Sequence, residues 1–160
     1  MYTWIVAVLV VVLDRITKML VVNNMSLGQS IPIIDGFFHL TFIRNPGAAF
    51  GLFAGRTAFF IGITVVVLLA ILYFQRYIPG EQKAARFCIG LILGGAFGNF
   101  IDRLYWGTVV DFLDFRIWVY IFNVADSALV VGSLLFALLL FFNKAGLDKE
   151  PVVDRIPPRY

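Results

Sequence analysis

The most constraining feature of this sequence is a run of 19 residues, from 57 to 75, that contains no charged side chain. A helix of about 20 mostly apolar residues is long enough to cross the hydrocarbon core of a bilayer. The whole chain is 61% hydrophobic and 14% charged, whereas soluble domains average about 45–50% and about 25%. The sequence therefore predicts an integral membrane protein, and it excludes a soluble globular domain and a disordered chain.

Three further apolar segments predict additional spans at residues 2–22, 87–101 and 123–142. Their few polar residues must face protein or a wet cavity, because lipid cannot hydrogen-bond to them. We therefore expect one domain of four transmembrane helices over residues 1–142, with outer loops at about residues 23–56 and 105–122. Residues 143–160 are charged and contain three prolines, so we expect them to form a mobile tail.

The distribution of Lys and Arg orients these spans. Four spans place both termini and the loop at residues 76–86 on one side, which carries seven Lys and Arg residues against three on the other side. Cytoplasmic loops are enriched in these residues. Both termini, and with them the tail, are therefore expected in the cytoplasm.

The two outer loops contain segments typical of β-strands. Apolar and polar residues alternate at residues 38–43, and residues 108–120 are rich in β-branched and aromatic side chains. Both patterns favour strands over helices. We expect a small β-sheet that rests on the outer membrane surface.

Acidic residues from several segments converge at one depth. At about 1.5 Å per residue, Asp14 lies ~20 Å and Asp102 ~24 Å along their spans from the cytoplasmic end. Asp126 falls in the first turn of the last span, and Asp111 and Asp114 follow the third span on the outer side. Such charges near the hydrocarbon core are candidates for function. Because residues 111 and 114 are an odd number apart on a strand, only one of them should face this site, and the other should be solvated or paired with an arginine.

The third span carries two sets of residues at helical spacing. Small residues recur at Gly90, Gly94 and Gly98. A polar side of the same helix contains Gly95, Asn99, Asp102 and Arg103. We expect the first set to let a neighbouring helix pack closely. For Asn99 and Arg103 two interpretations stay open, a role in helix packing and a role in the site.

Two further pairs have both a structural and a functional interpretation. Asp14 and Lys18 are spaced i, i+4 and predict a buried ion pair that fixes the first span. Asn123 is a good helix N-cap, and Asp126 at the third helical position would interact with the helix dipole. We favour a functional role for Asp126, because it lies at the depth of Asp111.

Two close carboxyl groups at a wet membrane site predict acid–base hydrolysis, since they share one proton and the charged one can activate water. The alternatives are a small proton-coupled transporter, which also uses intramembrane Asp residues, and a non-catalytic four-helix scaffold. A Ser127–Lys18 nucleophilic pair has no support in the spacing. With one cysteine, Cys88, and one histidine, His39, a zinc site would lack its usual ligands.

Five short motifs, taken in order, resemble those of bacterial lipoprotein signal peptidase, the signal peptidase II family. They are residues 13–18 (LDRITK), 44–51 (RNPGAAFG), 94–104 (GGAFGNFIDRL), 109–112 (VVDF) and 122–127 (FNVADS). Arg15 departs from the pattern, because many relatives have Gln at this position. The resemblance covers the chain from about residue 13 to residue 142.

The resemblance implies four transmembrane helices with a small extracytoplasmic β-cradle and a short surface helix. It also implies an intramembrane aspartic endopeptidase that cuts a prolipoprotein just before its diacylglyceryl-modified Cys, with Asp111 and Asp126 as the catalytic dyad. The enzyme would be a monomer in the bacterial cytoplasmic membrane, with its active site near the outer face. Its partners would be the prolipoprotein and membrane lipid, with no nucleic acid, cofactor or metal.

The resemblance further assigns a set of residues that bind substrate or support the site. They are Asp14, Lys18, Asn45, Gly47, Gly95, Asn99, Asp102, Arg103, Asn123 and Ala125. The outer loop around Phe50 would cover the substrate.

Overall fold

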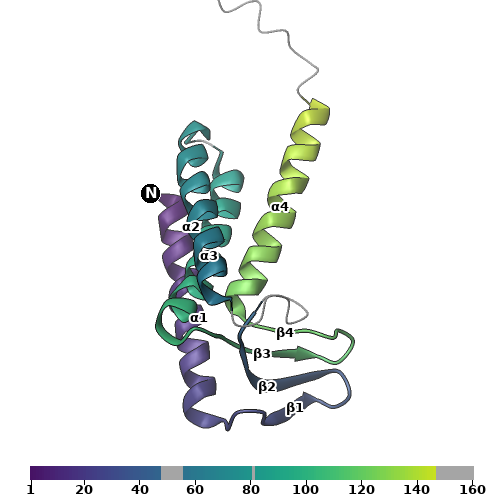
Figure 1. Cartoon of the computed structure of the whole chain (residues 1–160). Helices are drawn as coiled ribbons and strands as arrows, with labels where there is room; N and C mark the ends of the chain where they lie inside the picture. Colours follow the sequence, from purple (N-terminus) through teal and green to yellow (C-terminus); the bar gives the residue numbers. More distant parts are fainter. Residues whose placement is uncertain (48–55, 81, 147–160) are drawn as a thin grey trace, which may run out of the picture.

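The computed structural model describes residues 1–47, 56–80 and 82–146. Its four long helices are α1 (Tyr2–Asn24), α2 (Thr57–Phe74), α3 (Lys83–Trp106) and α4 (Val124–Gly146). A 3₁₀ turn, η2 (Gln75–Tyr77), follows α2. The helices alternate in direction, so the start of α1 and the end of α4 both lie away from the sheet (Figure 1).

Within the described residues, three helical segments are long and apolar enough to cross a membrane: Thr57–Tyr77, Lys83–Trp106 and Val124–Phe142. The expectation of transmembrane helices is thus confirmed for three of the four predicted spans. The fourth helix, α1, has 23 residues but carries Asp14, Arg15 and Lys18 along its length.

The strands form one antiparallel sheet in the order β1-β2-β3-β4. Their bounds are β1 (Ser30–Ile34), β2 (Phe38–Asn45), β3 (Val109–Phe115) and β4 (Ile121–Phe122). The two predicted strand regions correspond to β2 and to β3 with β4. Residues 116–120 are not one continuous strand as expected, because a tight turn in which Trp118 N–H donates to Phe115 O (2.8 Å) reverses the chain.

Strand β1 was not predicted from the sequence, and some expected features of the outer loops and the tail have no counterpart in the described residues. β1 contains Pro32, and all its residues are exposed, so it lacks the alternating pattern of a half-buried strand. Within the described residues, neither outer loop contains a short surface helix. Residues 48–55, with Phe50, and residues 147–160 of the expected tail lie outside the described residues, whereas residues 143–146, also expected in the tail, continue helix α4.

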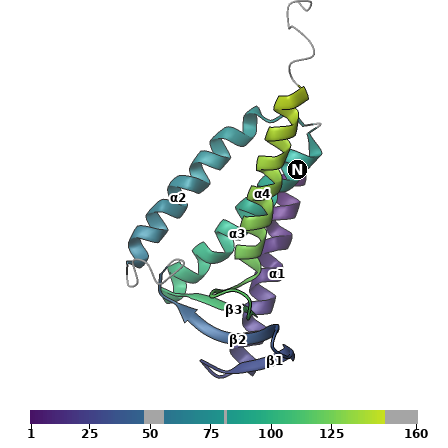
Figure 2. The same ribbon diagram turned by 90° about the vertical axis from the view of Figure 1, so that its right-hand side faces the viewer.

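Helix α3 is central and packs against α1, α2 and α4, with α1 and α2 on opposite sides of it (Figure 2). Its glycines explain the close approach of α1. A Cβ atom at Gly90 would lie 2.6 Å from Val6 Cβ, and one at Gly94 would lie 2.6 Å from Val10 Cβ. Both distances are far below van der Waals contact, so the packing role predicted for these small residues is confirmed.

Candidate active site

A cavity of about 710 Å³ lies where the sheet meets α2, α3 and α4. Six of the predicted site residues line it: Asn45, Gly47, Asn99, Arg103, Asp111 and Asp126. Its α2 wall is largely apolar and includes Ile63 and Val67. The cavity therefore combines two carboxyl groups with an apolar surface. Sequence reasoning did not anticipate the α2 wall, because α2 carries no charged side chain.

Asp111 on β3 is 1% exposed and accepts two hydrogen bonds. Asn123 Nδ2 donates to its Oδ1 (2.6 Å), and Asn45 Nδ2 donates to its Oδ2 (2.9 Å). Asp114 faces the other way, where Thr41 Oγ1 donates to its Oδ2 (2.6 Å) and Arg116 Nη2 lies 3.6 Å from it. The prediction that only one of these two residues faces the site, with the other paired, is confirmed.

Asp126 and Asn123 cap α4 reciprocally. Asp126 N–H donates to Asn123 Oδ1 (2.9 Å), and Asn123 N–H donates to Asp126 Oδ2 (3.3 Å). This is the geometry of a capping box, in which the side chain of each residue accepts a hydrogen bond from the backbone N–H of the other. The other oxygen of Asp126 accepts a hydrogen bond from Asn99 Nδ2 (2.6 Å). Asp126 therefore both caps α4 and lines the cavity.

Asn123 connects the two carboxyl groups. It is completely buried, its Nδ2 contacts Asp111, and its Oδ1 accepts from the Asp126 backbone. The same Nδ2 group also lies 3.1 Å from Asn99 Oδ1 and 3.3 Å from Val110 O. One side chain thus fixes β3, α3 and the start of α4 relative to one another.

The environment of Asp111 raises the pKa of its carboxyl group to about 7. Burial is the largest cause, because it disfavours the charged form, and the negative charge of Asp126 acts in the same direction. Hydrogen bonds from Asn45 and Asn123 and the positive charge of Lys18 oppose the rise of the pKa. A carboxyl group with this pKa can hold or release a proton near neutral pH.

A compact ion cluster lies beside the cavity. Lys18 Nζ is 2.9 Å from Asp14 Oδ2 and 2.8 Å from Asp102 Oδ2, and Arg15 Nη2 is 2.6 Å from Asp102 Oδ1. The predicted pair of Asp14 and Lys18 is confirmed. Lys18 also donates to Asn99 Oδ1 (3.2 Å). The cluster therefore acts on the site through Asn99, and Asp14, Lys18 and Asp102 do not line the large cavity.

Arg15 is a member of this cluster that sequence reasoning missed. The motif resemblance placed no site role at this position. Its only local signal was the adjacent Asp14, with which its Nη2 pairs at 3.1 Å. The contact with Asp102 joins residues far apart in the sequence, so it depends on how α1 packs against α3.

The remaining predicted residues hold the elements around the cavity together. Arg103 Nη2 donates to Gly47 O (3.3 Å), and Gly47 N–H donates to Asn45 Oδ1 (3.0 Å). Ala125 N–H donates to Asp14 Oδ1 (3.1 Å), which ties α4 to α1. A Cβ atom at Gly95 would collide with the carbonyl oxygen of Ala125. These contacts set the distance between β2 and α3 and between α3 and α4.

The described residues form neither a Ser–Lys nucleophilic pair nor a metal site. Ser127 Oγ donates to Asn123 O (2.9 Å), whereas Lys18 is engaged by carboxylates, so the two do not form a nucleophilic pair. Among the residues described, no group of three or more His, Cys, Asp or Glu side chains could hold a metal ion. Cys88 is buried in helix packing.

The fold is that of a helical membrane protein with two carboxyl groups lining one cavity, and comparison with known proteins shows which class shares this fold. A solved structure described as a bacterial membrane enzyme, obtained by the in meso method at 2.3 Å resolution, superposes with a TM-score of 0.83 at 38% identity, covering 94% of this chain and 93% of that one.

Sequence comparison then gives the family. The model of signal peptidase (SPase) II matches residues 6–142. The lipoprotein signal peptidase of Desulfitobacterium hafniense is 49% identical over 89% of this chain and 95% of its own length, and that of Bacillus subtilis is 47% identical over 94% and 99%. The chain belongs to the signal peptidase II family, which identifies it as a peptidase.

Proposed function

We propose that this protein is an aspartic endopeptidase that removes the signal peptide from diacylglyceryl-modified prolipoproteins. It cleaves the peptide bond just before the lipidated Cys. The observation that carries the proposal is that the carboxyl groups of Asp111 and Asp126 line one cavity and both accept hydrogen bonds from Asn123, from its Nδ2 and its backbone N–H respectively. The names of the relatives, lipoprotein signal peptidases, supply the substrate class.

In the proposed mechanism the two carboxyl groups share one proton. Asp111 carries it below about pH 7 and donates a hydrogen bond to the scissile carbonyl oxygen. Asp126 accepts a proton from a water molecule as that water attacks the carbonyl carbon. The proton taken up by Asp126 then passes to the leaving amine, and the C–N bond breaks. No covalent intermediate is required.

The polar network positions this pair. Lys18 donates to Asn99 Oδ1, and this contact turns the Nδ2 group of Asn99 toward Asp126. In the same way, the hydrogen bond of Asn45 holds Asp111 from the β2 side. We assign both asparagines to positioning, together with Asn123. The apolar α2 wall would face the signal peptide or the acyl chains of the substrate.

We further propose that α1 is the fourth transmembrane helix of a single domain spanning residues 1–142. Its charged residues Asp14 and Lys18 are buried against α3 and α4, at 0% and 2% exposure. Its outer face consists of exposed apolar residues such as Leu9, Leu13 and Leu20. The third charged residue, Arg15, is partly exposed at 21% and is paired with Asp14 and Asp102, so the face of α1 toward lipid is mainly apolar.

In this proposal both termini lie on the cytoplasmic side of the bacterial inner membrane, as the distribution of Lys and Arg in the sequence favours. The sheet and the site then lie near the outer face, where a lipidated Cys would present its peptide. In the ion cluster, the two positive charges of Arg15 and Lys18 balance the two negative charges of Asp14 and Asp102. All residues assigned to the site lie in one chain, so we propose that the protein acts as a monomer.

The proposal is tested with purified protein in lipid and two forms of one prolipoprotein, with and without the diacylglyceryl group. We expect cleavage of the modified form only, with the lipidated Cys as the new N-terminus by mass spectrometry. Equal cleavage of both forms would contradict the substrate assignment. No cleavage by folded protein, together with proton flux in liposomes, would favour the transporter instead.

A further inference from the structure

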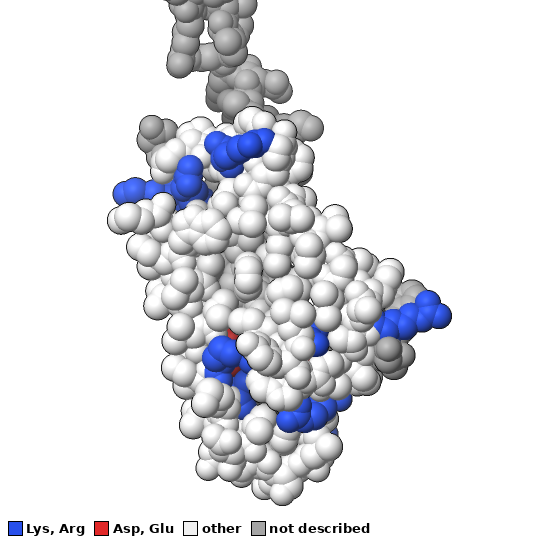
Figure 3. Space-filling model, turned by 60° about the vertical axis from the view of Figure 1, so that its left-hand side comes forward, with Lys and Arg blue, Asp and Glu red and all other residues white. Residues whose placement is uncertain are grey.

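A second cavity of about 210 Å³ lies between α1, the end of α3 and strands β2 and β3; it adjoins the ion cluster, and Arg44 lines both this cavity and the larger one. Three of its lining residues are cationic and one is acidic: Arg15, Lys18, Arg44 and Asp102. The rest of the lining includes the apolar side chains of Met19 and Trp106. Figure 3 shows basic side chains gathered around acidic atoms in the lower part of the face, with further basic side chains near its top and right edge.

The charges that line or border this cavity do not cancel. Arg15 and Lys18 are balanced by two carboxylates, Asp14 and Asp102. Arg44 on β2 is exposed, and no carboxylate of the described residues lies within 4.0 Å of it; its guanidinium lies over the Phe42 ring, 5.9 Å from the ring centre. The cavity therefore has one uncompensated positive charge.

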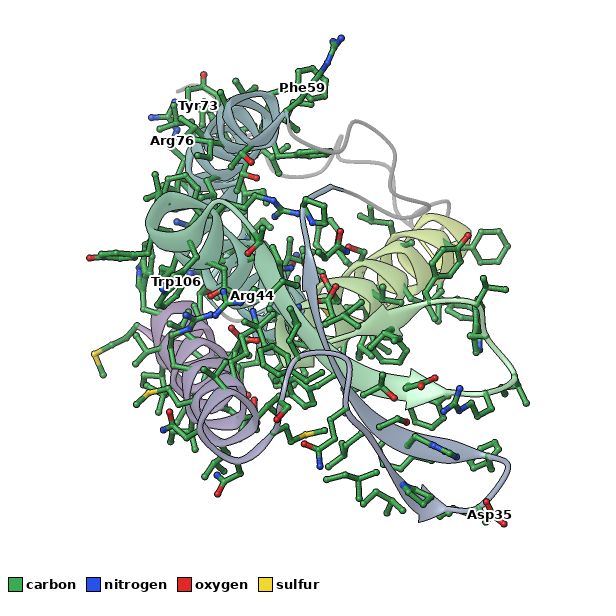
Figure 4. All side chains as sticks on the ribbon, turned by 60° about the horizontal axis from the view of Figure 1, so that its bottom comes forward. Asp35, Arg44, Phe59, Tyr73, Arg76 and Trp106 are labelled. Carbon is green, nitrogen blue, oxygen red and sulfur yellow. The ribbon has the colours of Figure 1, made fainter. Side chains whose placement is uncertain are left out.

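The surroundings of this charge are apolar. Trp106 at the end of α3 is 55% exposed, and Met19 on α1 is 61% exposed. Figure 4 shows Arg44 and Trp106 near each other beside α1. An exposed Trp at the end of a membrane helix is typical of the interface between hydrocarbon and water. The cationic cavity thus opens next to a surface that lipid acyl chains would cover.

We propose that this cavity binds the phosphate of an anionic phospholipid from the outer leaflet. Arg44 would donate to the phosphodiester through its planar fork, and the acyl chains would lie along Met19 and Trp106. A lipid with one negative charge matches the single excess positive charge. A zwitterionic lipid matches it less well, because its cationic group would find only Asp102, which Lys18 and Arg15 already engage.

The test is native mass spectrometry of the full chain with phosphatidylglycerol and phosphatidylcholine. We expect wild type to prefer phosphatidylglycerol, and Arg44→Gln to bind it about tenfold more weakly, the factor expected for loss of one charge-assisted hydrogen bond. The matched control is Arg116→Gln, which removes another exposed arginine, in the turn that follows β3, and should keep the preference. Equal binding of the two lipids by wild type, or equal behaviour of the two variants, would overturn the proposal.

A soluble competitor separates lipid from free phosphate. Glycerol 3-phosphate carries the phosphate without acyl chains, so we expect it not to displace bound phosphatidylglycerol. Efficient displacement would mean that the cavity recognises a free phosphate anion, and it would overturn the lipid assignment. Because Arg44 is exposed and forms no ion pair with the described residues, Arg44→Gln should unfold at the wild-type temperature. This test does not depend on peptidase activity.

Discussion

Replacing Asn45 with Leu should extend peptidase activity to higher pH. Asn45 Nδ2 donates to Asp111 Oδ2 at 2.9 Å, and this contact favours the ionised form of a carboxyl group whose pKa is about 7. A hydrogen bond to a charged group contributes about 1.5–3 kcal/mol, and about 1.36 kcal/mol corresponds to one pKa unit. Loss of the bond therefore raises the pKa of Asp111 by about one to two pH units, so the shared proton is kept to higher pH.

The assay is the dependence of kcat/KM for the lipidated substrate on pH, from about pH 5 to about pH 9. Wild type should lose activity as the pH rises through about 7, and Asn45→Leu should lose it one to two units later, with a lower maximum. Thr41→Val is the matched control, because it removes the hydrogen bond to Asp114 on the same strand pair and should leave the profile unchanged. An alkaline limb that stays in place or moves to lower pH in Asn45→Leu would show that Asn45 does not lower the pKa of Asp111.

Two further predictions concern stability in detergent, measured by thermal unfolding. Lys18→Met should destabilise the protein by about 3–5 kcal/mol, because it leaves two buried carboxylates with one cation fewer. Lys83→Met, at an exposed position, should have little effect. Equal melting temperatures of the two variants would contradict a structural role for the ion cluster. Gly98→Ala should destabilise the protein by about 1–3 kcal/mol, since the added Cβ atom would lie 2.7 Å from Asp14 Oδ2. The control is Gly62→Ala on α2, where an added Cβ atom has no neighbour within 4 Å. The opposite order of stability would show that α1 and α3 pack less closely than described.

Much of this architecture could be predicted from local sequence patterns. The charge-free run at residues 57–75 predicts α2, and the small residues every four positions predict the packing face of α3. The odd spacing of Asp111 and Asp114 predicts their opposite directions. These features depend only on the periods of helices and strands, which are written directly in the order of residues.

The polar network could be predicted only in part, because its contacts join distant segments. Asp14 and Lys18 are close in sequence, but Asp102 completes their cluster from another helix. Asn123 was expected as a cap, and nothing local indicates that its amide group also contacts Asp111. β1 has no burial pattern, since it is an exposed edge strand held by its pairing with β2.

The central claim is that Asp111 and Asp126 perform the hydrolysis. The most direct test is single-turnover cleavage of the lipidated substrate by Asp111→Asn, Asp126→Asn and Asp114→Asn, with folding checked by thermal unfolding. Asp114 is the matched control, because it is buried on the same strand and faces away from the cavity. We expect the first two variants to fold and lose cleavage, while the third cleaves at nearly the wild-type rate. Substantial cleavage by a folded Asp111→Asn or Asp126→Asn variant would contradict the central claim.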